Sequence, residues 1–350
     1  MTERNPQRPI TTRDVADAVG VNQSTVSRAL RNDPSVSKKM REKIRRMADE
    51  LGYRPNPFIS AFTAQVRGYR RSPQHASLAI LNAYRKDDQM DFLERYIQGA
   101  VKRAEQMGFR VDIFHFQELE SKEARLLQIL RTRGIRGLLV LPLPIYEDLS
   151  GFDVEHLACA TIDMTENLPA ISHAVPDYFR HMQTALIKLE SLGYKRIGFC
   201  TKTSEMHGFA RYSMASYLLW QQHLPARSRL KVHVDSGMDE RQAEDRDAFF
   251  EWLELGRPDA IVSNDIRYLN WMKEGGGEVP SEIGFANLSW EEDKSRSAGI
   301  DQRQSLVGSA AMDLVIGHIY RNEYGLPDAM KTVFVDGIWR DGETVRNLSA

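Results

Sequence analysis

Residues 11–56 constrain the fold most, because they hold three short helical patterns separated by strong stop and start signals. Thr11 and Asp14 have the spacing of a capping box, which opens a first helix. Gly20 ends that helix, whose inward positions are Val15, Ala16 and Val19. Three helices this short and this close together predict a helix-turn-helix unit, and DNA binding is the leading hypothesis.

The second helix is the candidate recognition helix. Asn22 is a suitable N-cap for a helix over residues 23–31. Helical spacing puts Ser24 and Arg28 on its outer face, while Val26, Ala29 and Leu30 face inward. Ser37 can cap a third helix over residues 38–51, which Gly52 stops. Its apolar positions are Met40, Ile44, Met47, Ala48 and Leu51.

Three short amphipathic helices also form small bundles that bind no DNA, and the charge distribution argues against that alternative. Residues 1–72 hold 15 Lys and Arg against 7 Asp and Glu, a net charge of +8. The other residues hold 32 basic against 41 acidic side chains, a net charge of −9. A basic head on an acidic body is expected if the head alone meets phosphates.

A hinge pattern follows the head. Asn56 can cap and Pro57 can start a short helix that runs to about residue 67. An isolated helix shorter than about 12 to 15 residues is marginal in water, so this one needs a partner such as DNA. The alternative is that its apolar residues Phe58, Ile59 and Phe62 pack on the body.

Beyond about residue 72, short apolar runs alternate with longer amphipathic segments, which predicts a doubly wound parallel α/β fold in two lobes. The predicted strands are 77–81, 110–116, 137–141, 159–162, 196–200, 260–263 and 283–286, and the predicted helices are 92–107, 122–132, 178–192 and 212–223.

The chain resembles the LacI/GalR (lactose-repressor) family of transcription regulators from Thr11 to near its C-terminus. The resemblance rests on V-A-x-x-x-G-V-x-x-x-T-V-S-R at residues 15–28, V-S-x-x-x-R-x-K-I at residues 36–44 and L-G-Y-R-P-N at residues 51–56. It implies an N-terminal helix-turn-helix head at residues 1–54, a hinge helix and linker at 55–72, and a body of two periplasmic-binding-protein-like lobes at 73–350. The N-lobe would hold about 73–168 and 301–331, and the C-lobe about 169–300 and 332–350, with crossovers near residues 168, 300 and 331.

For DNA, the resemblance implies a homodimer on a pseudo-palindromic operator, with paired recognition helices in successive major grooves and paired hinge helices in the central minor groove. Gln23, Ser24 and Arg28 would read base edges. Five residues would hold phosphates, namely Thr11, Thr25, Ser27, Ser37 and Asn56. In the hinge, Phe62 stands where the family has a leucine wedge and Ile59 where it has a small alanine, so the spacing of the two hinge helices is open.

For an effector, the resemblance implies a small molecule between the lobes. Asp265, in Ser263-Asn264-Asp265, matches a family aspartate that accepts hydrogen bonds from effector hydroxyls, and Arg211 matches an arginine that clamps the effector. Tyr84, Phe92 and Trp290 are placed to stack on a sugar ring, although core packing is the commoner role of aromatic side chains.

Departures from the family pattern leave the ligand open. Leu288-Ser289-Trp290 replaces a usual aspartate, residues 296–302 replace a proline-threonine segment, and Gly275 to Gly277 loosen a usual helix end. A hydroxyl-rich sugar or sugar acid is the default expectation, because an Asp and Arg pair suits hydroxyl and carboxylate groups. A vestigial pocket is the alternative. The family further favours repression over activation.

Other classes of protein fit less well. The chain has no Gly-x-Ser-x-Gly elbow, Walker-type phosphate loop or His-Glu-x-x-His helix, so we expect no catalytic residues and no cofactor. Asp177 and His181 are four apart on a predicted helix, a pair that is more often a packing contact than a catalytic dyad. Cys159 and Cys200 lack metal-like spacing.

A polar N-terminus without an apolar run of about 18 residues predicts a cytoplasmic protein and no membrane partner, which argues against an exported sugar-binding protein. A bilobed small-molecule-binding protein without specific DNA regulation is the remaining alternative.

Overall fold

A computed structural model describes residues 10–30, 33, 35–53, 76–85, 91–119, 122–164, 167–203, 210–291 and 296–349. The chain divides into two compact units, Met1–Ala76 with Gly317–Tyr324, and Ser77–Ile316 with Gly325–Ala350. The predicted hinge residues Asn56, Ile59 and Phe62 lie outside the described residues.

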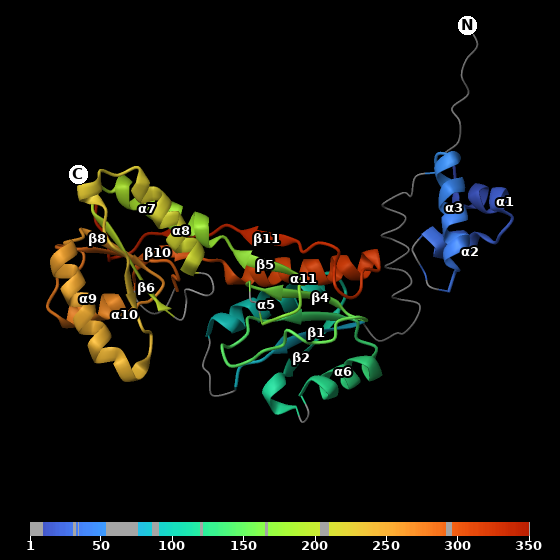
Figure 1. Ribbon diagram of the computed structural model, residues 1–350, viewed down its shortest axis with the longest axis horizontal. Coiled ribbons are helices and arrows are strands. Elements are labelled where there is room, and N and C mark those ends of the chain that lie inside the picture. Colours follow the sequence, from blue (N-terminus) through green and yellow to red (C-terminus); the bar gives the residue numbers. More distant parts are fainter. Residues whose placement is uncertain are drawn as a thin grey trace, which may run out of the picture. The chain divides into compact units, whose positions relative to one another are not determined.

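The head consists of three helices, α1 (Thr12–Val19), α2 (Gln23–Leu30) and α3 (Lys38–Glu50) (Figure 1). Its apolar core comes from all three helices and the turn before α3, and its buried members are Val15, Ala16, Val19, Val26, Ala29, Val36, Ile44 and Ala48. Leu51 was predicted to face inward, but it is the C-cap of α3 and is 36% exposed. The helix ends one residue earlier than predicted, where Gly52 adopts a positive φ of 71°.

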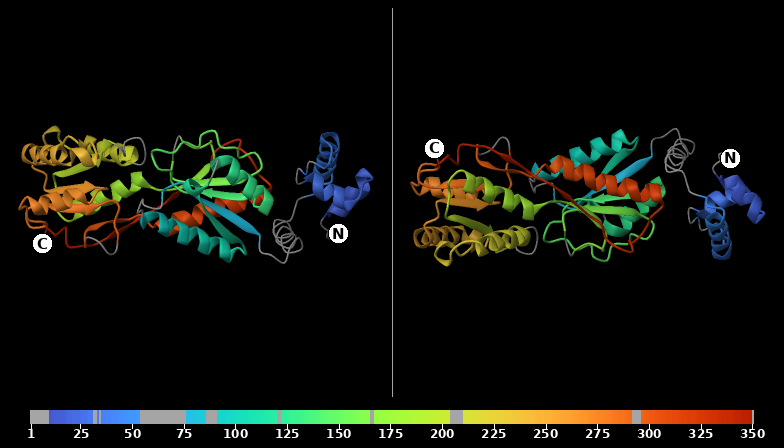
Figure 2. Two further views of the ribbon diagram at one scale, coloured as in Figure 1. Left: turned by 90° about the horizontal axis from the view of Figure 1, so that it is seen from below. Right: turned by 90° about the horizontal axis from the view of Figure 1, so that it is seen from above.

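The body contains two sheets, each of six strands among the described residues (Figure 2). Sheet A has the order β11-β5-β4-β3-β1-β2 and is parallel throughout. Its strands are β1 (Ser77–Asn82), β2 (Arg110–His115), β3 (Gly137–Val140), β4 (Ala158–Ile162), β5 (Ser172–Pro176) and β11 (Thr332–Val335).

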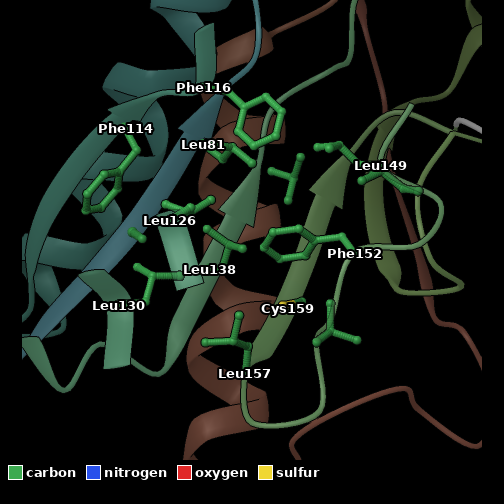
Figure 3. Close-up of a cluster of buried hydrophobic side chains, with 14 of the residues drawn as sticks. Leu81, Phe114, Phe116, Leu126, Leu130, Leu138, Leu149, Phe152, Leu157 and Cys159 are labelled. Atoms are coloured by element: carbon green, nitrogen blue, oxygen red, sulfur yellow. The ribbon is translucent and has the colours of Figure 1, made fainter. Parts of the chain in front are cut away.

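Helices cover both faces of sheet A, as a parallel sheet requires. They are α5 (Asp91–Gln106), α6 (Lys122–Arg133), the 3-10 turn η1 (Phe116–Glu118) and α11 (Gln304–Arg321). One core cluster joins α6 to inward residues of β1, β3 and β4. In Figure 3 these side chains, among them Leu126, Leu138 and Cys159, lie in front of the strands, while α11 passes behind them.

Sheet B has the order β12-β10-β9-β8-β6-β7 and is parallel except for the antiparallel pair β10 and β12. Its strands are β6 (Ile197–Lys202), β7 (His233–Asp235), β8 (Ala260–Ser263), β9 (Gly284–Asn287), β10 (Ala298–Asp301) and β12 (Ile338–Arg340). The helices are α7 (Tyr178–Ser191), α8 (Ala210–Gln222), α9 (Gln242–Gly256) and α10 (Arg267–Glu274), with 3-10 turns η3 (Ala226–Ser228) and η4 (Asp239–Arg241).

Alternation along the strands of sheet B divides its core between two helix layers. Val262 of β8 packs with α7 and α8, whereas its neighbour Ile261 packs with α9 and α10. Phe199 and Cys200 of β6 divide in the same way. Figure 1 accordingly shows α7 and α8 on one side of the sheet and α9 and α10 on the other. The predicted doubly wound α/β fold in two lobes is therefore confirmed.

The first and third crossovers between the two sheets differ from the predicted positions near residues 168 and 331, whereas the second follows β10 near the predicted residue 300. The chain leaves sheet A after β5, returns after β10, and leaves again after β11. The predicted C-lobe segments 169–300 and 332–350 therefore begin too early, because β5 pairs with β4 and β11 pairs with β5 inside sheet A. The segment before β12 gives the third crossover at Asp336 and Gly337.

Candidate functional site

Two local caps hold α1 and α3 of the head in place. The Thr11 hydroxyl donates to Asp14 Oδ2 at 2.7 Å and accepts from the Asp14 N–H at 3.4 Å, while the Thr11 N–H donates to Asp14 Oδ2 at 2.7 Å. This is the predicted capping box. Ser37 Oγ accepts from the Met40 N–H at 3.4 Å and caps α3. Thr11 and Ser37, both predicted phosphate contacts, therefore also have structural roles.

The outer face of α2 carries the predicted base-reading residues. Gln23, Ser24 and Arg28 are exposed, whereas Val26 and Ala29 are buried in the head core. The amide of Gln23 donates to Thr12 Oγ1 at 2.9 Å, and Arg28 Nε donates to the Ser24 carbonyl oxygen at 3.4 Å. The terminal guanidinium nitrogens of Arg28 take no part in that bond, so α2 presents a polar, cationic surface.

Two further predicted phosphate contacts, Thr25 and Ser27, lie half-buried on α2. Five exposed cations on α3 add to the charge of the head, namely Lys38, Lys39, Lys43, Arg45 and Arg46. Such a concentration of positive charge attracts the phosphate backbone of a nucleic acid over several ångströms.

In the body, Asp265 follows the carboxyl end of β8, where ligands are expected to bind in an open parallel sheet. Its carboxylate is already bound within the protein. Asp265 Oδ2 lies 2.7 Å from Lys202 Nζ and 2.7 Å from Arg267 Nε, and Oδ1 accepts from the Arg267 N–H at 2.9 Å. A ligand hydroxyl would therefore share Asp265 with two internal cations, which the sequence alone did not indicate.

Asp235 extends this charged group on the side of β7. Its Oδ2 accepts from the Tyr268 hydroxyl at 2.7 Å and lies 3.5 Å from Arg267 Nη2. Several buried polar atoms at this end of sheet B have no hydrogen-bond partner among the described residues, including both amide atoms of Asn264 and Asp235 Oδ1. The result is a polar cluster with two carboxylates and two cations.

Asp265→Asn should destabilise the protein at neutral pH. It should also reduce the dependence of the free energy of unfolding on pH in the acidic range. Burial by itself raises the pKa of Asp265, but Lys202 and Arg267 outweigh it and hold this pKa below its usual value. A lowered carboxyl pKa contributes stability above the unfolded-state pKa of about 3.9, and that stability is lost as pH falls below it. Since both cations keep some solvent exposure, we expect a loss of about 1 to 2 kcal/mol at pH 7.

The measurement is urea unfolding of both proteins at pH 7 and at pH 3. Equal stability of the two proteins at pH 7 would contradict the proposed ion-pair contribution. Asp247→Asn, which changes an exposed carboxylate on α9, is the matched control and should leave stability unchanged at both pH values.

Arg211 lies in the first turn of α8, where it acts on Asp163 at the end of β4. Burial raises the pKa of Asp163 to about 6, against the lowering effects of hydrogen bonds from Met164 and Tyr178 and of the Arg211 charge. Tyr178 OH lies 3.5 Å from Asp163 Oδ2, and the Tyr212 hydroxyl lies 3.3 Å from Met164 Sδ. The end of β4 in sheet A thus meets the N-terminal ends of α7 and α8.

Asp163 was not singled out from the sequence, although an aspartate directly after a buried strand is a usable signal. It has a positive φ of 71°, a backbone conformation that aspartate tolerates better than most residues. The structure therefore brings Arg211 near Asp163. Tyr84 and Phe92 belong to the same neighbourhood as Asp163. The Tyr84 ring contacts the Phe92 ring, which in turn contacts the Tyr96 ring. Burial and the charge of Asp163 raise the pKa of Tyr96.

The aromatic residues expected to stack on a ligand are half-buried. The Tyr84 and Phe92 rings meet edge to face with centroids 6.4 Å apart. Trp290 lies elsewhere, after β9, with the Arg340 guanidinium 5.5 Å from its ring centroid. Arg340 also binds Asp301 at 2.9 Å, so Trp290 is tied to β10 and β12 rather than to the Tyr84 group.

The described residues contain no group of three or more His, Cys, Asp or Glu side chains arranged to hold a metal ion. Within the same part of the chain, no helix has the length and apolar character needed to cross a membrane.

Comparison with known proteins agrees with this architecture. Residues 11–56 match the family described as "Bacterial regulatory proteins, lacI family". The transcriptional regulator DegA of Bacillus subtilis (strain 168) is 26% identical over 53% of this chain and 52% of its own length, so the chain spans about half of that relative. The transcriptional repressor CytR of Escherichia coli (strain K12) is 25% identical over 82% of this chain and 83% of CytR.

A solved structure of the lac repressor dimer bound to operator and the anti-inducer ONPF has the same fold, with a TM-score of 0.56 at 18% identity over 97% of this chain and 100% of that chain. Residues 11–56 thus carry the sequence pattern of the lacI family of bacterial regulatory proteins, and the two-lobed body has the fold of the lac repressor structure.

Proposed function

We propose that this protein is a sequence-specific transcriptional repressor that binds a pseudo-palindromic operator as a homodimer. The observation that carries the proposal is the outer face of α2, where Gln23, Ser24 and Arg28 are exposed on a helix that the head core holds in place. An exposed arginine on a recognition helix can donate two hydrogen bonds to guanine in the major groove. Thr25, Ser27 and Ser37 are the proposed phosphate contacts beside this face.

We further propose that a small molecule, with a sugar or sugar acid as the default class, binds at the carboxyl ends of the strands of both sheets. Arg211 and Asp163 meet there from opposite lobes, and Asp265 with Lys202 offers both acceptor and donor groups. A ligand shifts the lobes only by its different affinity for their two arrangements. It therefore induces if it prefers the weakly DNA-binding arrangement and corepresses if it prefers the other.

Sequencing of the DNA fragments that the purified full chain retains from fragmented host DNA tests this function. We expect enrichment of a pseudo-palindromic site, and repetition at higher salt should weaken binding while preserving the enriched sequence. The genes beside that site would indicate the effector. Retention of fragments without sequence preference, lost in salt, would instead favour a bilobed small-molecule-binding protein without specific DNA regulation.

A further inference from the structure

One histidine lies where all three crossovers between the lobes meet. His181 is in the first turn of α7, and its N–H donates to the Asp177 carbonyl oxygen of the first crossover at 2.8 Å. The third crossover passes the same ring closely, since a Cβ built on Gly337 would lie 2.7 Å from His181 Nε2. That Cβ would also lie 2.6 Å from Ile300 Cγ2, in the strand that leads to the second crossover.

The His181 imidazole is buried without a hydrogen bond. The residue is 2% exposed, and neither ring nitrogen has a hydrogen-bond partner among the described residues. The Val335 carbonyl oxygen is near enough to influence the ring, but it does not meet hydrogen-bond geometry there and accepts the Asp177 N–H at 3.0 Å. Buried polar groups nearly always have a partner, so this arrangement is unfavourable for a ring that could charge.

The charges of three carboxylates act on His181, namely Asp177 of the first crossover, Asp301 at the end of β10 and Asp336 of the third crossover. Each is engaged elsewhere. Asp177 Oδ1 accepts from the Arg180 N–H at 3.0 Å, and Asp336 lies 3.3 Å from Arg180 Nη1. Asp301 binds Arg340 at 2.9 Å, while the Tyr178 ring meets the imidazole edge to face at 6.1 Å.

Any change in the angle between the lobes bends the backbone at these crossovers, and so changes what surrounds His181. Burial lowers the pKa of His181 to about 4, and the three carboxylates, which raise it, only partly compensate. The ring is therefore neutral at pH 7 in the described arrangement. In an arrangement that exposes the ring or pairs it with one carboxylate, the charged form is no longer penalised.

We propose that His181 makes the lobe arrangement proton-dependent, so that acidification favours an arrangement other than the described one. This regulation concerns the body alone, and it affects operator binding only if the proposed function also holds. A histidine whose pKa is lowered in one arrangement stabilises that arrangement fully at pH values above its ordinary pKa. This stabilisation decreases as pH falls toward the lowered pKa. With limits of about 6.5 and about 4, His181 alone shifts the equilibrium between arrangements about tenfold from pH 7.5 to pH 5.5.

The distance between spin labels on the two lobes tests the proposal in the full chain. Ala124→Cys on α6 and Ala248→Cys on α9 place labels at exposed positions of the two lobes. The native Cys159 and Cys200 stay unlabelled, because they are buried and burial raises the pKa of both thiols. An excess of unlabelled protein keeps most label pairs within one protomer.

We expect the population of the pH 7.5 distance to decrease at pH 5.5, by up to about tenfold relative to the second population, since protonation of Asp163, with a pKa of about 6, acts in the opposite direction. In His181→Gln, which keeps a polar side chain that does not titrate, this decrease should be lost. A wild-type distance distribution that is the same at both pH values would overturn the proposal, as would an equal pH response in His181→Gln. Since this readout needs no DNA, failure of the DNA-selection experiment would leave it interpretable.

A second pair of variants keeps the test valid if His181→Gln does not fold. The Asp336 side chain is 56% exposed, so Asp336→Asn should fold. Its carboxylate raises the His181 pKa in the described arrangement, so without it the charged ring is penalised more there, and the decrease at pH 5.5 should be at least as large as in wild type. Arg180→Gln removes the cation but keeps the carboxylate, so its decrease should be no larger than in wild type. A smaller decrease in Asp336→Asn than in wild type, or a larger one in Arg180→Gln, would contradict the role assigned to His181.

Discussion

Arg28→Ala should weaken binding to the preferred operator by about 1 to 3 kcal/mol, or about 5- to 150-fold, and relax the choice of base at one position in each half-site. The expected loss is specific because the Arg28 side chain is exposed and is held within the head by a long bond, 3.4 Å from its Nε to the Ser24 carbonyl oxygen. The fold of the head should not change. Binding of the variant to the preferred site and to single-base variants of that site measures both effects.

Arg46→Ala is the matched control. Arg46 is an exposed cation of the same charge on α3, outside the proposed base-reading face. Its removal should lower affinity for all sequences to a similar degree and reduce the salt dependence of binding by at most about one phosphate contact. If Arg28→Ala also lowered affinity equally for the operator and for unrelated DNA, Arg28 would be a phosphate contact and not a base contact.

Gly308→Ala should destabilise the body by about 2 kcal/mol. The added Cβ would lie 2.1 Å from the Tyr96 carbonyl oxygen, a backbone atom that no change of rotamer can move. Overpacking a core costs about 1 to 3 kcal/mol, and this contact calls for the upper end of that range. Alanine recovers at most about 1 kcal/mol through its higher helix propensity, so the steric cost prevails.

Urea unfolding checks this prediction, with Gly151→Ala as control. A Cβ on Gly151 would meet nothing within 4 Å, so that substitution should change the free energy of unfolding little. A Gly308→Ala protein as stable as wild type would show that α5 and α11 can separate without loss. The same contact recurs at Gly99 of α5, whose added Cβ would meet the Ser305 backbone of α11.

Local signals made the head predictable from the sequence. The Thr11 and Asp14 spacing, Gly20, and Ser37 each act within a few residues, and the structure places α1 and α3 at the positions they indicate. Apolar runs likewise predicted β8 at its observed bounds. These features need no information about distant parts of the chain.

Strands with polar residues were missed. β5 contains Ser172 and His173, both buried, so it has no apolar run. The two residues are satisfied by the distant segment before β11: Ser172 Oγ accepts from the Lys331 N–H at 3.2 Å, and the His173 N–H donates to the Lys331 carbonyl oxygen at 2.9 Å. Because only the assembled sheet supplies these partners, the first and third crossovers were predicted too early.

The candidate effector site was predictable only in part. Asp265 and Arg211 were named from the resemblance, but the cations that hold Asp265 come from β6 and α10. The surroundings of Asp163 and His181 come from segments that are distant in the sequence. The charge of Asp336, for example, acts on His181 although the two residues are more than a hundred positions apart. Side-chain charges of this kind carry no periodic signal.

The order of strands in the two sheets has a consequence for synthesis. The core residues of the head all lie within residues 15–53, so a nascent chain holds them early. Sheet A, by contrast, receives its edge strand β11 and the helix α11 from residues after 303, and sheet B receives β12 still later. Domains generally fold as units in the order of their synthesis. The complete helix-turn-helix head therefore emerges from the ribosome long before the last strand of either sheet has been synthesised. A prematurely terminated chain carries that head without the complete lobes that would regulate it.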